Sequence, residues 1–300
     1  MVRVSVTISG LSRLFGADLA AVVDAARAAD AAGVHQIVLP DHLAIGTRTD
    51  RYPFAPTFPY PPEEPWLEPL ATLAAIAAVT ERVRLGTGVL VGPLRGALLL
   101  AKSIATLDVL SHGRVDLGIG SGWQREEFTE PGAPFVGRTA RLDDQVRACR
   151  ALWEQAPPVS FASDTVSFTD LWCEPRPVQA RLPIWFGGDQ SLRTARRIVA
   201  VGDGWLPVGV PPDEVLIEGI ANLRTACDEV GRDRSTVGIR AGLPVALDAY
   251  GRVDLAATRV RADELGALGV TTVSVALGRF LAGPDDVVPF LTDLGATFRD

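Results

Sequence analysis

Two short apolar segments that end in glycine are the part of this sequence best suited to hold a ligand. Arg84–Pro93 and Gly113–Trp123 both have the length and composition of a strand. Glycine removes side chains and lets backbone amides approach a flat ligand closely. We therefore predict a shared floor of bare backbone for a planar ring, formed by Thr87, Gly88, Val89, Gly120, Ser121 and Gly122.

His42 is the candidate for proton chemistry. It follows the predicted strand Gln36–Pro40 and has Asp41 beside it. An imidazole titrates near neutral pH, so it can give or take a proton during a reaction. A histidine that only holds loop backbone in place is the alternative for His42, and a local turn is the alternative for Asp41.

A third segment, Pro183–Arg197, ends a strand in Gly187 and Gly188 and then begins a helix near Ser191. Helix N-termini bind anions through unpaired N–H groups, and a serine there can cap the helix or donate its hydroxyl. A phosphate site and an ordinary capped turn both fit these residues.

The elements that must position these residues alternate regularly along the chain. Helical segments separate the strand-like ones, which predicts a (β/α)8 barrel in a single domain, residues 1–300. An open doubly wound sheet is the alternative, but the glycine fingerprint that usually follows its first strand is absent. The predicted strands are Val4–Ser9, Gln36–Pro40, Val83–Val91, Arg114–Gly120, Pro183–Gly187, Gly204–Val208, Val237–Leu247 and Thr272–Ala276. The predicted helices are Asp18–Ala32, Leu67–Thr80, Ala97–Ser111, Thr139–Gln155, Leu192–Val201, Pro212–Val230, Leu255–Leu268 and Asp285–Thr297.

The helix Ala97–Ser111 is long enough to be a crossover, so the two glycine-ended strands should run parallel and end on one rim. Barrel enzymes place their sites on that rim. The segment Gly46–Pro65, rich in proline and aromatic residues, also belongs there. It either walls a hydrophobic pocket or packs its own rings. His35 and His112 precede strands and belong to the opposite face, so we expect neither to be catalytic.

Composition excludes several classes of function. A net charge of -7 without a basic run argues against a nucleic-acid surface. The sequence shows neither a leader nor an apolar stretch long enough for a membrane span, so a cytoplasmic protein is expected. Cys149, Cys173 and Cys227 lie far apart and suggest neither a disulfide scaffold nor a metal site.

Five segments together resemble the luciferase-like monooxygenase superfamily: Pro40–Leu43, Pro65–Val91, Ala105–Phe128, Glu174–Gly188 and Gly202–Gly209. The sequence is most similar to the branch of probable coenzyme F420-dependent oxidoreductases, which are relatives of FMN-dependent monooxygenases. The resemblance implies a luciferase-like barrel with rim loop insertions, a small-molecule substrate and a homodimer.

The resemblance also implies roles for individual residues. Asp41 matches a position that contacts the coenzyme, and Gly187, Gly188 and Ser191 match a phosphate site. The Gly88–Val89 bond stands where the superfamily often has a cis peptide that bulges against the ring.

Departures from the family pattern bear on the substrate. Deazaflavin enzymes that oxidise sugars or secondary alcohols tend to pair the rim histidine with a tryptophan and a glutamate, at places that hold Gly46 and Ser121 here. The first strand's end also lacks their acid, and Gly96–Ala97 stands where His-Pro is usual. Reduction of an activated alkene or imine, or oxygenation, therefore fits better than alcohol oxidation.

The sequence thus predicts an oxidoreductase that transfers a hydride between coenzyme F420 and a small organic substrate. An FMN-dependent monooxygenase that uses O2 is the first alternative. A catalytically silent barrel that stores a flavin, and a plain interaction scaffold, are the others.

Overall fold

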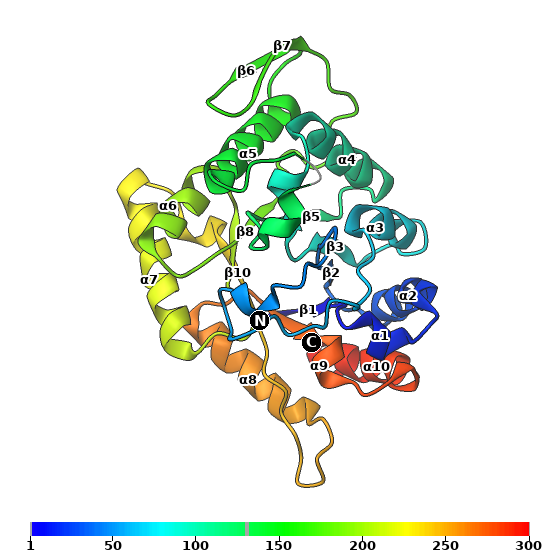
Figure 1. The fold of residues 1–300 in the computed structure, drawn as a ribbon. Coiled ribbons are helices and arrows are strands. Elements are labelled where there is room, and N and C mark those ends of the chain that lie inside the picture. The colour runs from blue at the N-terminus through cyan, green and yellow to red at the C-terminus, as the bar shows by residue number, and fades with distance from the viewer. Residues whose placement is uncertain (1, 130–131, 300) are drawn as a thin grey trace.

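The computed structural model describes residues 2–129 and 132–299, and it shows a closed parallel barrel (Figure 1). Each strand pairs with the next, and the contact between β3 and β5 and that between β1 and β11 complete the circle. The (β/α)8 prediction is confirmed. The barrel strands are β1 (Arg3–Thr7), β2 (Gln36–Leu39), β3 (Arg84–Thr87), β5 (Val115–Gly120), β8 (Ile184–Gly187), β9 (Gly204–Leu206), β10 (Gly238–Gly242) and β11 (Thr272–Ala276).

Helices surround the barrel, and each predicted helix overlaps an observed one (Figure 1). Their starts follow from local chemistry: Glu68 and Asp254 accept hydrogen bonds from the first-turn amides of α3 and α8. The covering helices are α2 (Val22–Ala32), α3 (Pro69–Ala77), α4 (Ala97–Leu110), α5 (Arg138–Glu154), α6 (Leu192–Val201), α7 (Asp213–Val230), α8 (Leu255–Leu268) and α10 (Val287–Phe298). Among the described residues, no helix combines the length and apolarity needed to cross a membrane.

Most of the short elements were not predicted, because one or two turns carry too little periodicity to stand out in a sequence. The exceptions are Leu19–Ala21, which lies within the predicted helix Asp18–Ala32, and Pro284–Asp286, which overlaps the start of the predicted helix Asp285–Thr297. Two of the short elements are helices and six are 3-10 turns: α1 (Leu11–Phe15), α9 (Leu277–Phe280), η1 (Leu19–Ala21), η2 (Thr49–Arg51), η3 (Gly92–Leu94), η4 (Arg125–Phe128), η5 (Arg234–Thr236) and η6 (Pro284–Asp286).

The predicted strands need three corrections: Val83–Val91 is interrupted at Gly88 and Val89 and forms β3 and β4 (Leu90–Val91), one hairpin was missed, and one strand is too long. An antiparallel hairpin, β6 (Val159–Ala162) and β7 (Ser167–Leu171), stands outside the barrel between α5 and β8. Its strands are half-exposed rather than apolar, which is why a search for buried strands missed them. The predicted strand Val237–Leu247 is too long. It ends at Gly242, and its remainder leads to a turn that a bridge between Leu247 and Val253 closes.

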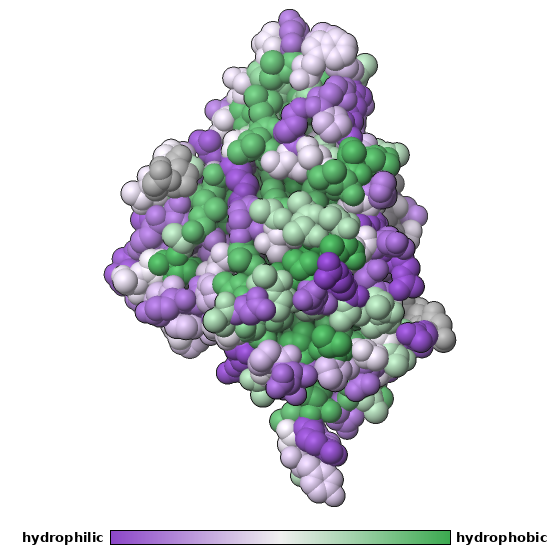
Figure 2. Space-filling model, turned by 90° about the vertical axis from the view of Figure 1, so that its right-hand side faces the viewer, coloured by the Kyte–Doolittle hydropathy of each residue, from purple (hydrophilic) through white to green (hydrophobic). Residues whose placement is uncertain are grey.

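The surface on the side of α3 and α4 carries hydrophobic patches among polar residues (Figure 2). Leu98 and Leu99 of α4 are 44% and 63% exposed. Exposed apolar side chains that lie together are typical of contact surfaces between proteins.

The barrel interior is polar where most barrels hold branched apolar side chains. Asp116 of β5 receives hydrogen bonds of 2.6 Å from Gln36 Nε2 and from Arg84 Nη2. Gln36 Oε1 in turn accepts a 2.8 Å bond from Arg240 Nη1. Gly86 makes room for this network, because a Cβ there would lie 3.0 Å from Gln36 Nε2.

Both histidines assigned to the opposite face precede strands, as expected. His112 lies in the turn before β5 and has a positive φ of 56°. His35 precedes β2, where burial and the neighbouring Arg3 lower its pKa from 6.5 to about 4.

This shift predicts an acid-sensitive fold. Below pH 6.5 the unfolded chain binds a proton at His35 that the folded chain refuses until about pH 4, so stability falls as the pH drops through that range. Going from about pH 7 to pH 5 should cost about 1 kcal/mol from this group, after allowance for solvent screening. Urea denaturation at both pH values should show a smaller loss for His35→Gln than for the unchanged protein; equal losses would contradict the assignment.

Candidate active site

The mouth of the barrel is organised around Val89. The Gly88–Val89 peptide is cis, as the resemblance implied, and lies between β3 and the short strand β4 (Leu90–Val91). A Cβ added at Gly120 would lie 2.6 Å from Val89 Cγ2, and one at Gly187 would lie 2.9 Å from Val89 Cγ1. These glycines are therefore required first by the barrel's own packing, since they receive the Val89 side chain.

The predicted floor divides into residues that support it and residues that solvent reaches. Thr87 and Gly120 are buried, and Thr87 Oγ1 donates a 2.6 Å hydrogen bond to the Gly118 carbonyl. Gly88, Val89, Ser121, Gly122 and Gly187 are only half-buried. Solvent therefore reaches the bulge, while the neighbouring Thr87 and Gly120 are buried.

The side chain of Asp41 is fully enclosed. Its carboxylate accepts a 2.8 Å hydrogen bond from Val91 N and bonds of 2.6 and 3.1 Å from the Arg95 guanidinium. Asp41 therefore ties the end of β4 to Arg95 in this structure. Its contact with a coenzyme stays a prediction.

His42 has an acidic partner that the sequence did not reveal. Glu127 Oε1 lies 3.1 Å from His42 Nδ1 and also accepts a 3.0 Å hydrogen bond from Leu43 N. The Glu127 side chain is 0% exposed and that of His42 is 9% exposed. The interpretation that the rim histidine lacks an acid was wrong, because η4 supplies one six residues after Ser121.

This pairing selects one tautomer of the histidine when Glu127 is ionised. A carboxylate only accepts hydrogen bonds, so it assigns a proton to Nδ1. Nε2, which bonds to none of the described residues, is then the atom that can take up or release a proton. A base oriented by a buried acid is the arrangement that acid–base catalysis requires.

An aromatic cage surrounds His42. Its ring centroid lies 4.9 Å from that of Trp66, 5.2 Å from Phe58 and 6.2 Å from Trp123. Tyr60 extends the cage and donates a 2.9 Å hydrogen bond to Ser9 Oγ. The rings of the loop Gly46–Pro65 thus pack together, which is one of the two alternatives for this segment; a role in walling a substrate pocket stays a prediction.

Three buried polar atoms around the cage have no partner among residues 2–129 and 132–299: Trp66 Nε1, Trp123 Nε1 and Glu127 Oε2. Buried polar groups are nearly always satisfied by protein, water or ligand. Two donors and one acceptor near His42 are therefore free to bind a polar ligand or water. In this respect the residues present suit a flavin-type cofactor.

The start of α6 holds an anion of its own. Ser191 caps the helix, and its hydroxyl and that of Thr194 each donate a 2.6 Å bond to Asp189 Oδ1. Burial raises the pKa of Asp189, but the bonds from Ser191 and Thr194 outweigh it and leave the pKa below its usual value. A phosphate beside Gly187, Gly188 and Ser191 would share this helix end with a carboxylate, so that role stays a prediction.

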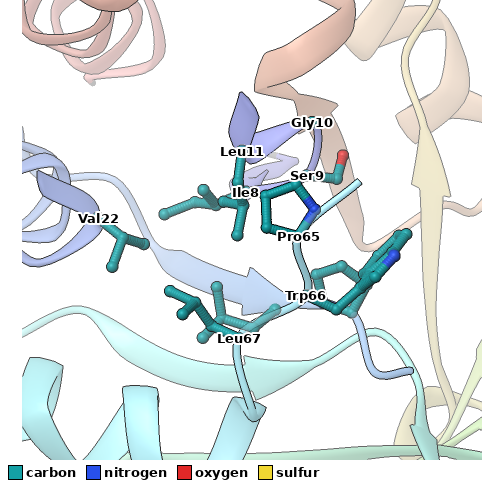
Figure 3. Close-up of a pocket in the computed structure, with 10 residues that line it drawn as sticks. Ile8, Ser9, Gly10, Leu11, Val22, Pro65, Trp66 and Leu67 are labelled. Carbon is teal, nitrogen blue, oxygen red and sulfur yellow. The ribbon is translucent and has the colours of Figure 1, made fainter. Parts of the chain in front are cut away.

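A small cavity lies behind the cage, between the ends of β1 and β2 and the segment Pro65–Leu67 (Figure 3). Its volume of about 10 Å³ holds no more than a water molecule. Trp66 forms one of its walls. The cavity is therefore packing space behind the site, too small for a substrate.

Residues 3–259 match the family described as luciferase-like monooxygenase. An uncharacterised protein of Mycobacterium tuberculosis is 35% identical over 229 residues, which cover 75% of this chain and 77% of the relative. Two matches of named activity are shorter. The FMNH2-dependent dimethylsulfone monooxygenase of Pseudomonas putida is 34% identical over 44% of this chain and 36% of its own. The F420-dependent glucose-6-phosphate dehydrogenase of Amycolatopsis mediterranei is 35% identical over 47% of this chain and 42% of its own.

Solved structures share the fold across the whole chain. The monooxygenase RslO1 from Streptomyces bottropensis superposes with a TM-score of 0.80 at 20% identity, covering 99% of this chain and 98% of its own. An F420-dependent secondary alcohol dehydrogenase superposes with a TM-score of 0.79 at 16% identity, covering 100% and 99%. At these identities the likeness concerns the fold.

The role of Glu127 can be tested without any ligand. Glu127→Ala leaves the Leu43 amide and His42 Nδ1 without an acceptor in a buried place, so it should reduce the free energy of unfolding by about 1 to 3 kcal/mol. Chemical denaturation measures this. The neighbouring Glu126→Ala is the matched control, because Glu126 is exposed and its nearest cation, Arg51, lies 3.8 Å away. Equal losses in both variants would refute the buried pairing.

Proposed function

The chain belongs to the luciferase-like monooxygenase family, and on that premise we propose that it is a coenzyme F420-dependent oxidoreductase. It transfers a hydride between the deazaflavin and a small organic substrate. The observation that carries the proposal is the His42–Glu127 pair, whose histidine directly follows Asp41, the residue bonded to Val91 just after the Gly88–Val89 floor. The F420-dependent glucose-6-phosphate dehydrogenase among the relatives supports the choice of coenzyme.

In this proposal the floor residues bind and orient the ring. Gly88 and Val89 present bare backbone and one apolar side chain to its face, with Thr87 and Gly120 beneath and Ser121 and Gly122 at its edge. Asp41 acts through Val91 and Arg95 by fixing β4. Gly187, Gly188 and Ser191 take the phosphate end. A bound deazaflavin supplies the ring carbon that gives or accepts hydride.

His42 manages the proton that accompanies hydride transfer. Glu127 keeps the imidazole oriented through Nδ1, so Nε2 is the atom that donates a proton when a substrate is reduced. The rings of Phe58, Trp66 and Trp123 pack around the imidazole, whose side chain is 9% exposed, and so limit the access of water to it. Exclusion of water strengthens the electrostatic effect of the His42–Glu127 pair on the reacting group.

The cage also supports a substrate class. Aromatic walls favour an apolar, flat molecule, and the indole N–H groups of Trp66 and Trp123 could donate to one polar atom on it. An activated alkene or imine has both features. Glu127 is hydrogen-bonded to His42 and is therefore not a second, independent acid for the substrate. We therefore propose that the enzyme reduces its substrate rather than oxidises an alcohol.

An FMN-dependent monooxygenase that uses O2 is the second candidate. It is favoured by the FMNH2-dependent relative from Pseudomonas putida, and a glycine floor accepts either ring system. A silent flavin-storing barrel and an interaction scaffold remain alternatives that the experiments below separate.

We further propose that residues 1–300 act as one domain and form a homodimer in the cytoplasm. The exposed Leu98 and Leu99 on α4 support an interface between copies. Cys149, Cys173 and Cys227 are free thiols, which suits a reducing compartment.

Coenzyme choice is decided by titration. We expect purified protein to bind coenzyme F420 with a dissociation constant at least about tenfold lower than that for FMN, as measured by fluorescence titration of each. Tighter binding of FMN would reverse the order of the two candidates. Binding of neither ring would favour the scaffold.

His42→Gln should separate catalysis from storage. Loss of the proton donor predicts a fall in turnover of about 100-fold or more, with coenzyme affinity changed by no more than about threefold. Cyclohexenone serves as the activated-alkene probe, and oxidation of the reduced coenzyme is followed by its absorbance. His112→Asn, on the opposite face, is the control and should leave turnover unchanged. Unchanged turnover in His42→Gln would favour a role for His42 outside catalysis.

A further inference from the structure

Arg240 of β10 lies inside the barrel directly beneath the floor. It is only 7% exposed. Its guanidinium donates a 2.8 Å hydrogen bond to Gln36 Oε1 and a 3.3 Å bond to the carbonyl of Thr87, the residue before Gly88. A Cβ at Gly88 would lie 2.4 Å from Val38 Cγ1 and 3.2 Å from Arg240 Nη2, so the guanidinium lies close to the backbone of the floor.

The charge of Arg240 has no counter-ion in contact. None of the described carboxylates forms an ion pair with it, since Asp116 is taken up by two hydrogen bonds of 2.6 and 2.7 Å from Arg84 and reaches Arg240 only through Gln36. The charged groups along the barrel axis are thus two arginines and one aspartate. Burial lowers the pKa of Arg240 to about 10, which still leaves it charged at neutral pH.

Burial of an unpaired charge is costly, and two neutral acceptors offset only part of that cost. An apolar side chain would fill the same space without the penalty. A buried cation under an open binding floor is therefore well placed to act on a ligand that gains negative charge above it.

We propose that Arg240 stabilises the reduced, negatively charged form of the planar ring bound on Gly88 and Val89. This inference rests on the proposed function. A hydride carries two electrons and one proton, so its transfer to the ring adds one negative charge, and its return to a substrate removes that charge. In this proposal Arg240 does not touch the ring, because the floor lies between them. The same effect is expected for coenzyme F420 and for FMN.

A purely structural role for Arg240 makes a different prediction. If it only holds the Thr87 carbonyl, its loss weakens binding of the oxidised and reduced ring alike. An electrostatic role changes the ratio of the two affinities. That ratio is therefore the readout.

The experiment measures dissociation constants of oxidised and reduced coenzyme F420, and of FMN in parallel, under anaerobic conditions. We expect the unchanged protein to bind the reduced form more tightly. Arg240→Lys should largely keep the preference, and Arg240→Gln should lower the ratio of affinities about tenfold, which for a two-electron couple corresponds to about 30 mV. Arg13→Gln, an exposed arginine near the barrel's first strand end, controls for loss of one positive charge and should leave the ratio unchanged.

Each outcome bears on a separate claim. Binding of neither coenzyme by the unchanged protein defeats the proposed function and this inference together. Binding with equal or weaker affinity for the reduced form defeats this inference alone, and so does an unchanged ratio in Arg240→Gln. If Arg240→Gln fails to fold, the double variant Arg240→Met with Gln36→Leu replaces the buried polar pair by apolar side chains and is measured instead. The ratio of affinities in the unchanged protein tests the inference in either case.

Discussion

The contact of Val89 with the glycines of neighbouring strands is the constraint on which the barrel mouth depends. The methyl groups of Val89 occupy the places where side chains of Gly120 and Gly187 would stand, and the Thr87 carbonyl occupies that of Gly118. Any larger residue at these positions would force the end of β3 outward. The pairing of β3 with β5, which closes the barrel, directly precedes these contacts along both strands.

Glycines make room for side chains at two levels of this barrel, at its mouth and in its interior. Toward the mouth they receive Val89, and below, Gly86 and Gly88 leave space for Gln36 and Arg240. The interior therefore holds a hydrogen-bonded network where side-chain bulk would otherwise fill it. The network reaches from Arg84 at the start of β3 to the Thr87 carbonyl at its end.

The sequence predicted the elements well because their signals are local. Apolar runs and helical periodicity located the barrel strands and covering helices, and the glycine runs located the rim. The His42–Glu127 contact joins residues 85 positions apart and could not be read from spacing. Ser121 stands at the place where the family has an acid. Here the acid is Glu127 of η4, and only the folded backbone shows that it returns to His42. Arg240 gave no signal either, since nothing in its neighbourhood distinguishes a buried arginine from an exposed one.

From the sequence alone, we interpret the glycine floor as bare backbone for a ligand. The structure gives these glycines a second reason, which is packing against the Val89 side chain. This matters for how strongly such motifs argue for function. A glycine that a neighbouring side chain fills would be needed in a barrel without any cofactor, so Gly120 and Gly187 by themselves say little about chemistry. The stronger argument comes from features that packing does not require: a histidine oriented by a buried glutamate, indole N–H groups without partners among the described residues, and a cation that contacts none of the described carboxylates. The indole N–H groups and the buried cation are costly for the fold alone, and the His42–Glu127 pair orients a titratable group, which is why we propose the chemistry for the barrel mouth.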